Sequence, residues 1–113
     1  MTASGIGAVY LETHNWGKTA RFLQGLGFEI EFETDHNSGQ FRHSDGPYVF
    51  VAEIPPTQDA GTRLVVTGDD ASLRPGDEVE IVSDFEQTHF GTQEMTVRDP
   101  DGRLWQLQAP GKE

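Results

Sequence analysis

Histidine is the side chain best suited to acid and base catalysis near neutral pH, because its unperturbed pKa is about 6.5. The chain has four histidines, at positions 14, 36, 43 and 89. No two of them are two or four residues apart, so neither a strand nor a helix presents two imidazoles on one face. Exposed loop positions are expected for all four, with His43 and His89 retained as candidates for a metal-free general base.

Carboxylates are the second group that could carry out acid or base chemistry. Glu29, Glu31 and Glu33 alternate with apolar residues between positions 28 and 32. This alternation predicts a strand with one face in the core and an acidic face in water. Acids on one face of a strand are about 7 Å apart, and such a row discourages pairing at a sheet edge. A solvated surface is the favoured interpretation, and catalysis is the alternative.

The composition restricts the cofactors. The chain has no cysteine, which excludes disulfides, thiolate nucleophiles and thiolate metal ligands. Any metal ion would therefore need histidine, carboxylate or amide ligands. The sequence has no phosphate-binding loop, no serine-nucleophile elbow and no dinucleotide-binding glycine pattern.

The charge balance restricts the partners. The formal net charge is -11, and the eight lysines and arginines are scattered along the chain. A nucleic-acid partner is not expected, since phosphate binding needs clustered basic residues. The acidity favours solubility, and the alternative is electrostatic steering of a cationic small molecule. No apolar run approaches the ~20 residues that span a bilayer, so we expect a cytoplasmic protein without a membrane partner.

The elements that position these groups follow from hydrophobic periodicity and capping signals. Strands are predicted, in chain order, at residues 6–13, 28–33, 40–43, 48–54, 63–67, 79–83, 93–98 and 103–109. A helix is predicted from Trp16 to Leu26, with Asn15 as its N-cap and Gly27 as a left-handed C-terminal cap. The strand at 48–54 is mostly apolar, which suits a strand buried on both faces.

The second half of the chain repeats this order of elements without a full helix. A polar, proline-led linker covers residues 55–61. The short segment before Pro75 leaves room for only about one or two helical turns. We therefore expect one α+β domain over residues 1–113, with a β-α-β-β-β module at about 5–54 and a second module, with a shortened helix, at about 62–109.

The strongest local signal is a hairpin within Val97–Leu107. In the turn Asp99-Pro100-Asp101-Gly102, proline presets φ and glycine supplies the positive φ that closes the turn. The following strand alternates, so that one face is bulky and apolar and the other carries the amides of Gln106 and Gln108.

This hairpin, together with Leu26-Gly27-Phe28, resembles the vicinal-oxygen-chelate superfamily of glyoxalases, bleomycin resistance proteins and extradiol dioxygenases. In that superfamily Asp-Pro-Asp-Gly commonly precedes the last strand. The resemblance implies two β-α-β-β-β modules whose curved mixed sheets surround a cavity. It also implies a homodimer that completes this cavity.

The resemblance further implies metal ligands on the first strand, near the end of the fourth, on the fifth and on the last. The matching positions are, in that order, Gly7 or Ala8, Glu53, Thr62 or Arg63, and Gln106. Glycine and alanine have no ligating atom, and the arginine guanidinium stays protonated. A catalytic divalent ion needs about three protein ligands. We therefore expect no cofactor, with a divalent metal ion held by Glu53 and Gln106 as the alternative.

Aromatic and polar residues remain as the lining of a small-molecule pocket. The predicted ligand-binding residues are Phe41, His43, Tyr48, Phe50, Glu53, His89, Phe90 and Gln106. Core packing is the competing interpretation for the aromatic residues, above all for Phe50. The resemblance implies a metal-free protein that sequesters an antibiotic or another cationic or aromatic ligand at a dimer crevice. The alternative is a glyoxalase-like, metal-dependent lyase or isomerase, and the sequence leaves open whether the protein is an enzyme.

Overall fold

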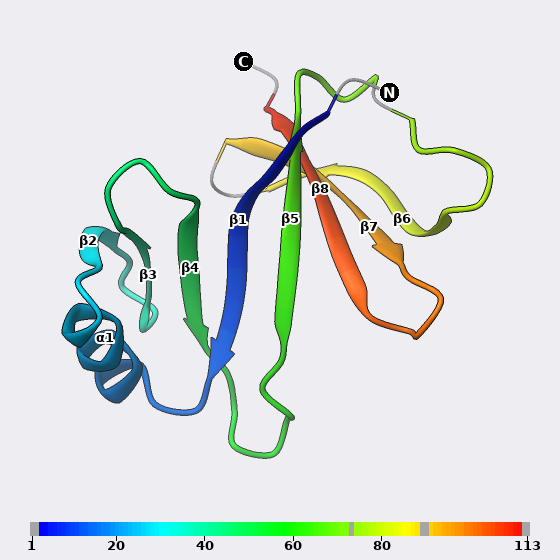
Figure 1. Ribbon diagram of the computed structural model, residues 1–113. Helices are drawn as coiled ribbons and strands as arrows, with labels where there is room; N and C mark the ends of the chain where they lie inside the picture. Colours follow the sequence, from blue (N-terminus) through cyan, green and yellow to red (C-terminus); the bar gives the residue numbers. More distant parts are fainter. Residues whose placement is uncertain (1–2, 73, 89–90, 112–113) are drawn as a thin grey trace. The chain divides into compact units, whose positions relative to one another are not determined.

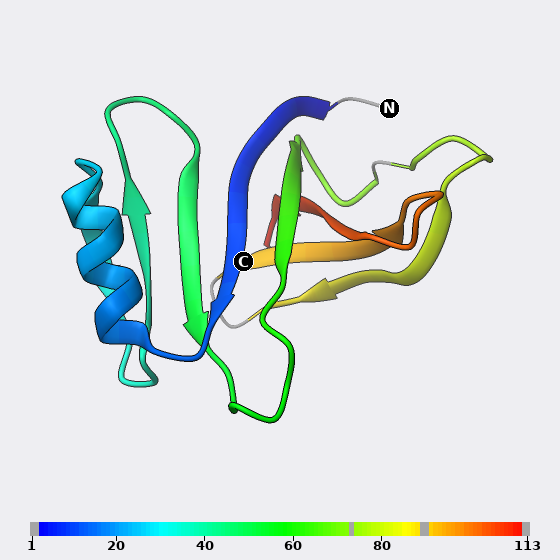
Figure 2. The same cartoon turned by 60° about the horizontal axis from the view of Figure 1, so that its bottom comes forward.

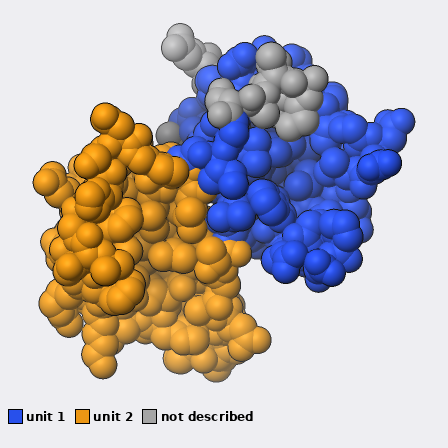
Figure 3. Space-filling model, in the orientation of Figure 1, with its two compact units in different colours: residues 1–7, 63–113 blue, residues 8–62 orange. Residues whose placement is uncertain are grey.

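The computed structural model describes residues 3–72, 74–88 and 91–111. The chain forms two compact units: unit 2 holds residues 8–62, and unit 1 holds residues 1–7 and 63–113 (Figure 3). The start of the first strand thus groups with the second half of the chain, whereas the predicted boundaries placed it in the first module. Among the described residues, no helix has the length and apolar character needed to cross a membrane.

Unit 2 consists of one helix and a four-stranded sheet. Its elements are, in chain order, β1 (Ala3–Thr13, which begins in unit 1), α1 (Trp16–Gly25), β2 (Glu29–Glu33), β3 (Ser38–Arg42) and β4 (Tyr48–Glu53). The strand order is β2-β3-β4-β1, in which β1 runs parallel to β4 and the other neighbours are antiparallel (Figure 1). The predicted elements are present, and β1 begins three residues earlier than expected.

The ends of α1 follow the predicted capping chemistry. The Asn15 side chain accepts a hydrogen bond from the backbone N–H of Lys18 at 3.0 Å, and Gly27 has a φ of +96°. The helix itself ends at Gly25, and Leu26 is its C-cap residue. Both capping predictions are confirmed.

The core of unit 2 lies between α1 and one face of the sheet. Ala20 and Leu23 of the helix pack with Phe41, Val49 and Val51 of the strands. Figure 2 shows α1 running beside these strands. The helix thus covers one face of the sheet, and the opposite face is left for other contacts.

Two predictions about strand faces are wrong. A bulge in β2 places Ile30 opposite Phe41 but Phe32 opposite Gln40, so Phe32 turns away from the core and is 41% exposed. One extra residue at a bulge reverses the alternation of faces. In β4, only the side chains facing α1 are fully buried, whereas Phe50 on the other face is half-buried.

Unit 1 is a sheet without a helix among its described residues. Its further strands are β5 (Thr62–Gly68), β6 (Glu80–Gln87), β7 (Thr92–Arg98) and β8 (Leu104–Pro110). They are ordered β5-β8-β7-β6, with β5 parallel to β8 and the other pairs antiparallel. Met95, Val97 and Leu107 form the core on one face.

The predicted hairpin closes β7 and β8. Gly102 has a φ of +88°, and its N–H donates to the Asp99 carbonyl at 3.0 Å. The prediction of a shortened second helix is wrong. The described residues 69–72 and 74–79 form only turns, bends and irregular backbone. A few residues before Pro75 offer too few hydrogen bonds to offset helix nucleation.

Candidate functional site

The predicted ligand-binding residues separate into different environments. Phe41 is fully buried beneath α1, where its ring lies 5.6 Å from that of Trp16. Phe41 therefore packs in the core, and its predicted role in ligand binding is corrected. His43 lies just beyond the end of β3, exposed, with its ring edge-on to Phe28 at 5.4 Å. His89 and Phe90 lie outside the described residues.

Three aromatic rings form a row on the face of the unit 2 sheet opposite α1. We call Tyr10, Phe32 and Phe50 the aromatic row. The rings of Tyr10 and Phe50 are stacked at 6.1 Å, and those of Phe32 and Phe50 are tilted at 6.2 Å. The register explains the row, because Phe50 pairs with Tyr10 on one side and with Gln40 on the other, and Gln40 pairs with Phe32. Sequence reasoning selected Phe50 and missed its two neighbours.

Charged and polar side chains flank the aromatic row. The Arg42 guanidinium lies 5.6 Å from the centre of the Tyr48 ring. Its Nε donates to both oxygens of Glu31 at 3.1 Å, and Gln40 Nε2 donates to Glu31 Oε1 at 2.9 Å. The hydrogen bond from Gln40, followed by that from Arg42, lowers the pKa of Glu31. An ionised carboxylate and a cation thus stand beside the aromatic surface.

Glu53, at the end of β4, forms hydrogen bonds with the start of α1 and with Asn37. Its Oε1 accepts the backbone N–H of Trp16 at 2.9 Å, at the start of α1, and its Oε2 accepts Asn37 Nδ2 at 3.0 Å. The hydrogen bond from Trp16, and then that from Asn37, lowers the pKa of Glu53. The carboxylate therefore completes the capping of the helix N-terminus.

Gln106 lies in a polar cluster on one face of the unit 1 sheet. Its Oε1 accepts hydrogen bonds from Arg63 Nη1 and Thr96 Oγ1, each at 3.0 Å. Its Nε2 donates to Glu94 Oε1 at 3.1 Å, and Gln108 Nε2 approaches Glu94 Oε2 at 3.4 Å. All five side chains are half-buried. We call Arg63, Glu94, Thr96, Gln106 and Gln108 the amide network.

The amide network does not fit the divalent metal ion that the resemblance implies. A carbonyl oxygen has two acceptor sites, and Arg63 and Thr96 occupy both sites on Gln106. A Cβ at Gly7 would lie 2.5 Å from the methyl group of Thr67, and Ala8 is 1% exposed, so neither of these two positions has space for a ligating side chain. Within the described part of the chain, no group of three or more His, Cys, Asp or Glu could hold a metal ion.

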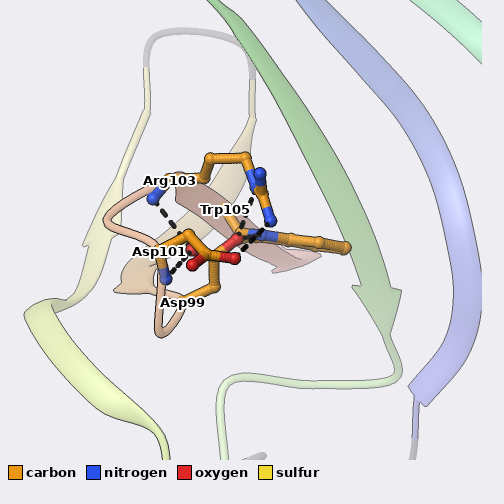
Figure 4. A network of polar contacts seen from close by, with 4 residues as sticks. All are labelled: Asp99, Asp101, Arg103 and Trp105. Carbon is orange, nitrogen blue, oxygen red and sulfur yellow. Dashed lines mark hydrogen bonds and ion pairs between the residues drawn. The ribbon is translucent and has the colours of Figure 1, made fainter.

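A second polar network fixes the β7–β8 turn in unit 1 (Figure 4). Asp99 Oδ2 accepts Trp105 Nε1 at 3.0 Å and Arg103 Nε at 2.9 Å, while Oδ1 accepts the backbone N–H groups of Asp101 and Arg103. These donors, Trp105 first, lower the pKa of Asp99 to about 2. The network holds the hairpin.

A pocket of about 210 Å³ lies beside this hairpin. Its lining includes Val79, Val97, Trp105 and Leu107, and none of the predicted site residues. Pockets for drug-sized ligands are usually about 300–1,000 Å³. This pocket is smaller than that range.

Comparison with known proteins rests on structure alone, since no protein-family model and no curated protein matches the sequence. Methylmalonyl-CoA epimerase from Mycobacterium tuberculosis is 13% identical to this chain, with a TM-score of 0.72. The match covers 97% of this chain and 90% of the epimerase chain. A protein named NAD-dependent benzaldehyde dehydrogenase from Legionella pneumophila is 16% identical with a TM-score of 0.69, covering 91% and 97%.

A third solved structure carries the superfamily's name. A glyoxalase/bleomycin resistance protein/dioxygenase superfamily member from Vibrio splendidus 12B01 is 18% identical with a TM-score of 0.62, covering 96% of this chain and 99% of its own. The names of the three structures describe different activities, so their likeness establishes the fold and no reaction. The predicted α+β class is confirmed, and the chain has the vicinal-oxygen-chelate fold of the glyoxalase/bleomycin resistance/dioxygenase superfamily.

Proposed function

We propose that this protein binds a small, planar organic molecule on its aromatic row and sequesters it without a resident metal ion. The observation that carries the proposal is the alignment of Tyr10, Phe50 and Phe32 on the sheet face opposite α1. Phe32 is 41% exposed, and the other two rings are half-buried. Such rings offer flat surfaces for offset stacking, and an aromatic pair stabilises by about 0.5–1.5 kcal/mol beyond its buried area.

The ligand class that fits this surface best is a cationic aromatic molecule, a class that includes some antibiotics. The faces of aromatic rings attract cations, by about 0.5–2 kcal/mol depending on exposure. Glu31 beside the row already pairs with Arg42 at 3.1 Å, so the attraction for a cation comes from the ring faces and from the net charge of -11, which raises the local concentration of cations. Sequestration requires tight binding and no chemical step.

A metal-dependent lyase or isomerase is the competing proposal. It draws on the fold shared with methylmalonyl-CoA epimerase. Against it stands the amide network, in which both acceptor sites of Gln106 Oε1 are already occupied. Glu53 accepts one hydrogen bond on each carboxylate oxygen, and one of these bonds caps the start of α1.

The proposal includes a homodimer and a cytoplasmic location. β6 ends the strand order of unit 1, so one of its edges has no neighbouring strand among the described residues. Ile81 and Val82 on β6 are 46% and 45% exposed. Exposed apolar side chains on a free edge suit pairing with a second copy, and sedimentation velocity separates a dimer from a monomer.

The test of ligand binding is a fluorescence titration with acridine orange, a planar cationic dye. Phe50→Leu removes the central ring, and we expect it to weaken dye binding several-fold. Phe22→Leu is the matched control, because Phe22 is 64% exposed on α1, outside the row. Equal affinities of the two variants, with unchanged circular dichroism spectra, would contradict the proposal. So would a wild-type protein that does not bind the dye.

A further inference from the structure

Arg63 differs from four of the chain's other five arginines, which have a carboxylate partner. Arg42, Arg74, Arg98 and Arg103 each pair with a carboxylate within 4.0 Å. Within residues 3–72, 74–88 and 91–111, Arg63 forms no ion pair, and its Nη1 donates to the neutral amide of Gln106. A half-buried cation without a counter-ion has lost hydration that no opposite charge offsets.

Gln106 accepts a hydrogen bond from this guanidinium, and its own amide has a fixed orientation. Its amide oxygen faces Arg63 and Thr96, and its amide nitrogen faces Glu94. If the amide oxygen and nitrogen were exchanged, the amide N–H groups would face the N–H groups of Arg63, and the amide oxygen would face the carboxylate of Glu94. The network therefore permits one orientation of the amide. The amide thus bridges the cation and the acid, which form no direct ion pair within 4.0 Å in the described structure.

Glu94 is engaged on its other side. Its Oε2 is approached by Gln108 Nε2 and by Thr92 Oγ1, each at 3.4 Å. The carboxylate is therefore held by amide and hydroxyl donors, and the remaining N–H groups of Arg63 keep their capacity for an external acceptor. A planar guanidinium binds a carboxylate through two parallel hydrogen bonds.

We propose that Arg63, positioned by Gln106, binds the carboxylate or a similar oxyanion group of a small organic ligand. Arg63 is one of the two residues, with Thr62, that match the fifth-strand position where the resemblance implies a metal ligand. Its guanidinium supplies a fixed positive charge there, in a network that does not fit a metal ion. This site belongs to unit 1 and is independent of the proposed binding of cations by the aromatic row in unit 2.

The test is a nuclear magnetic resonance titration with benzoate, and benzamide serves as a neutral probe of the same shape. We expect benzoate, and not benzamide, to shift the side-chain resonances of Arg63 and Gln106 in a saturable way. Arg63→Gln should weaken benzoate binding about tenfold or more, since hydrogen bonds between charged groups are the strong ones. Arg63→Lys should retain partial binding because it keeps the charge without the planar fork.

Two further variants keep the proposal falsifiable if Arg63→Gln does not fold. Arg98→Gln is the matched control, because Arg98 lies in the same unit and already pairs with Glu80 at 2.6 Å, and its benzoate affinity should stay near the wild-type value. Gln106→Glu should weaken benzoate binding because its new carboxylate would pair with Arg63. The proposal is overturned if the wild-type protein shows no saturable benzoate shift. It is also overturned if Gln106→Glu or a folded Arg63→Gln binds benzoate like the wild type.

Discussion

At the scale of single residues, the side chain at position 106 connects a cation with a carboxylate on the unit 1 sheet. A carboxamide both donates and accepts, so Gln106 connects Arg63 with Glu94 while remaining uncharged. A carboxylate at this position would pair with Arg63 and repel Glu94. The single difference between glutamine and glutamate therefore converts an implied metal ligand into a support for a cation.

Asp99 makes a second residue-scale prediction, which concerns pH. Its pKa is about 2 in the folded protein, against 3.8 for an unperturbed aspartate. A lowered pKa stabilises the fold fully above pH 3.8, and this stabilisation is lost as the pH falls toward 2. Asp99→Asn should therefore lower the Tm at pH 7, and the difference from wild type should shrink between pH 4 and pH 2.

Thermal unfolding followed by circular dichroism measures this difference. Asp101→Asn is the control, since the Asp101 side chain is 75% exposed and pairs with the exposed Arg103. It should change the Tm little at any pH. A difference between wild type and Asp99→Asn that stays constant from pH 7 to pH 2 would contradict the role given to the Asp99 carboxylate.

At the scale of elements, the features predicted correctly depend on residues that are close in the sequence. Asn15 and Gly27 bound α1, and Pro100 and Gly102 form the β7–β8 turn, because each side chain restricts its own backbone or its near neighbours. The bulge in β2 has no such local signal. Its effect on Phe32 follows from pairing with β3, which a single strand does not specify.

The candidate site was harder to predict for the same reason. Arg63 and Gln106 are 43 residues apart and meet through the parallel pairing of β5 with β8. Tyr10 joins Phe50 through the parallel pairing of β1 with β4. Sequence patterns identified Gln106 and Phe50 one strand at a time, whereas their partners depend on the register between strands.

The C-terminal end of α1 gives an element-scale prediction. Gly27 has a φ of +96°, and a Cβ there would lie 2.9 Å from His43 Nε2, so Gly27→Ala should destabilise by about 1 kcal/mol. Gly25 lies in the helix with no atom within 4 Å of an added Cβ, so Gly25→Ala should stabilise by up to about 1 kcal/mol. Urea unfolding measures both, and a stabilising Gly27→Ala would show that this cap is not required.

At the scale of the molecule, two units with the same order of strands have acquired different surfaces. Unit 2 has a helix over one face and the aromatic row on the other, whereas the described part of unit 1 has no helix and carries the amide network. The net charge of -11 acts over the whole chain and favours cationic ligands in solution. These features together support ligand binding without metal chemistry.

The affinity for acridine orange before and after removal of metal ions tests this account most directly. Protein purified without chelator is titrated with the dye, then dialysed against EDTA and titrated again, with metal content measured at both stages. We predict binding in both titrations with the same Kd, because the aromatic row supplies the binding surface. A stoichiometric divalent ion whose removal abolishes dye binding would contradict the account and favour a metal-dependent protein.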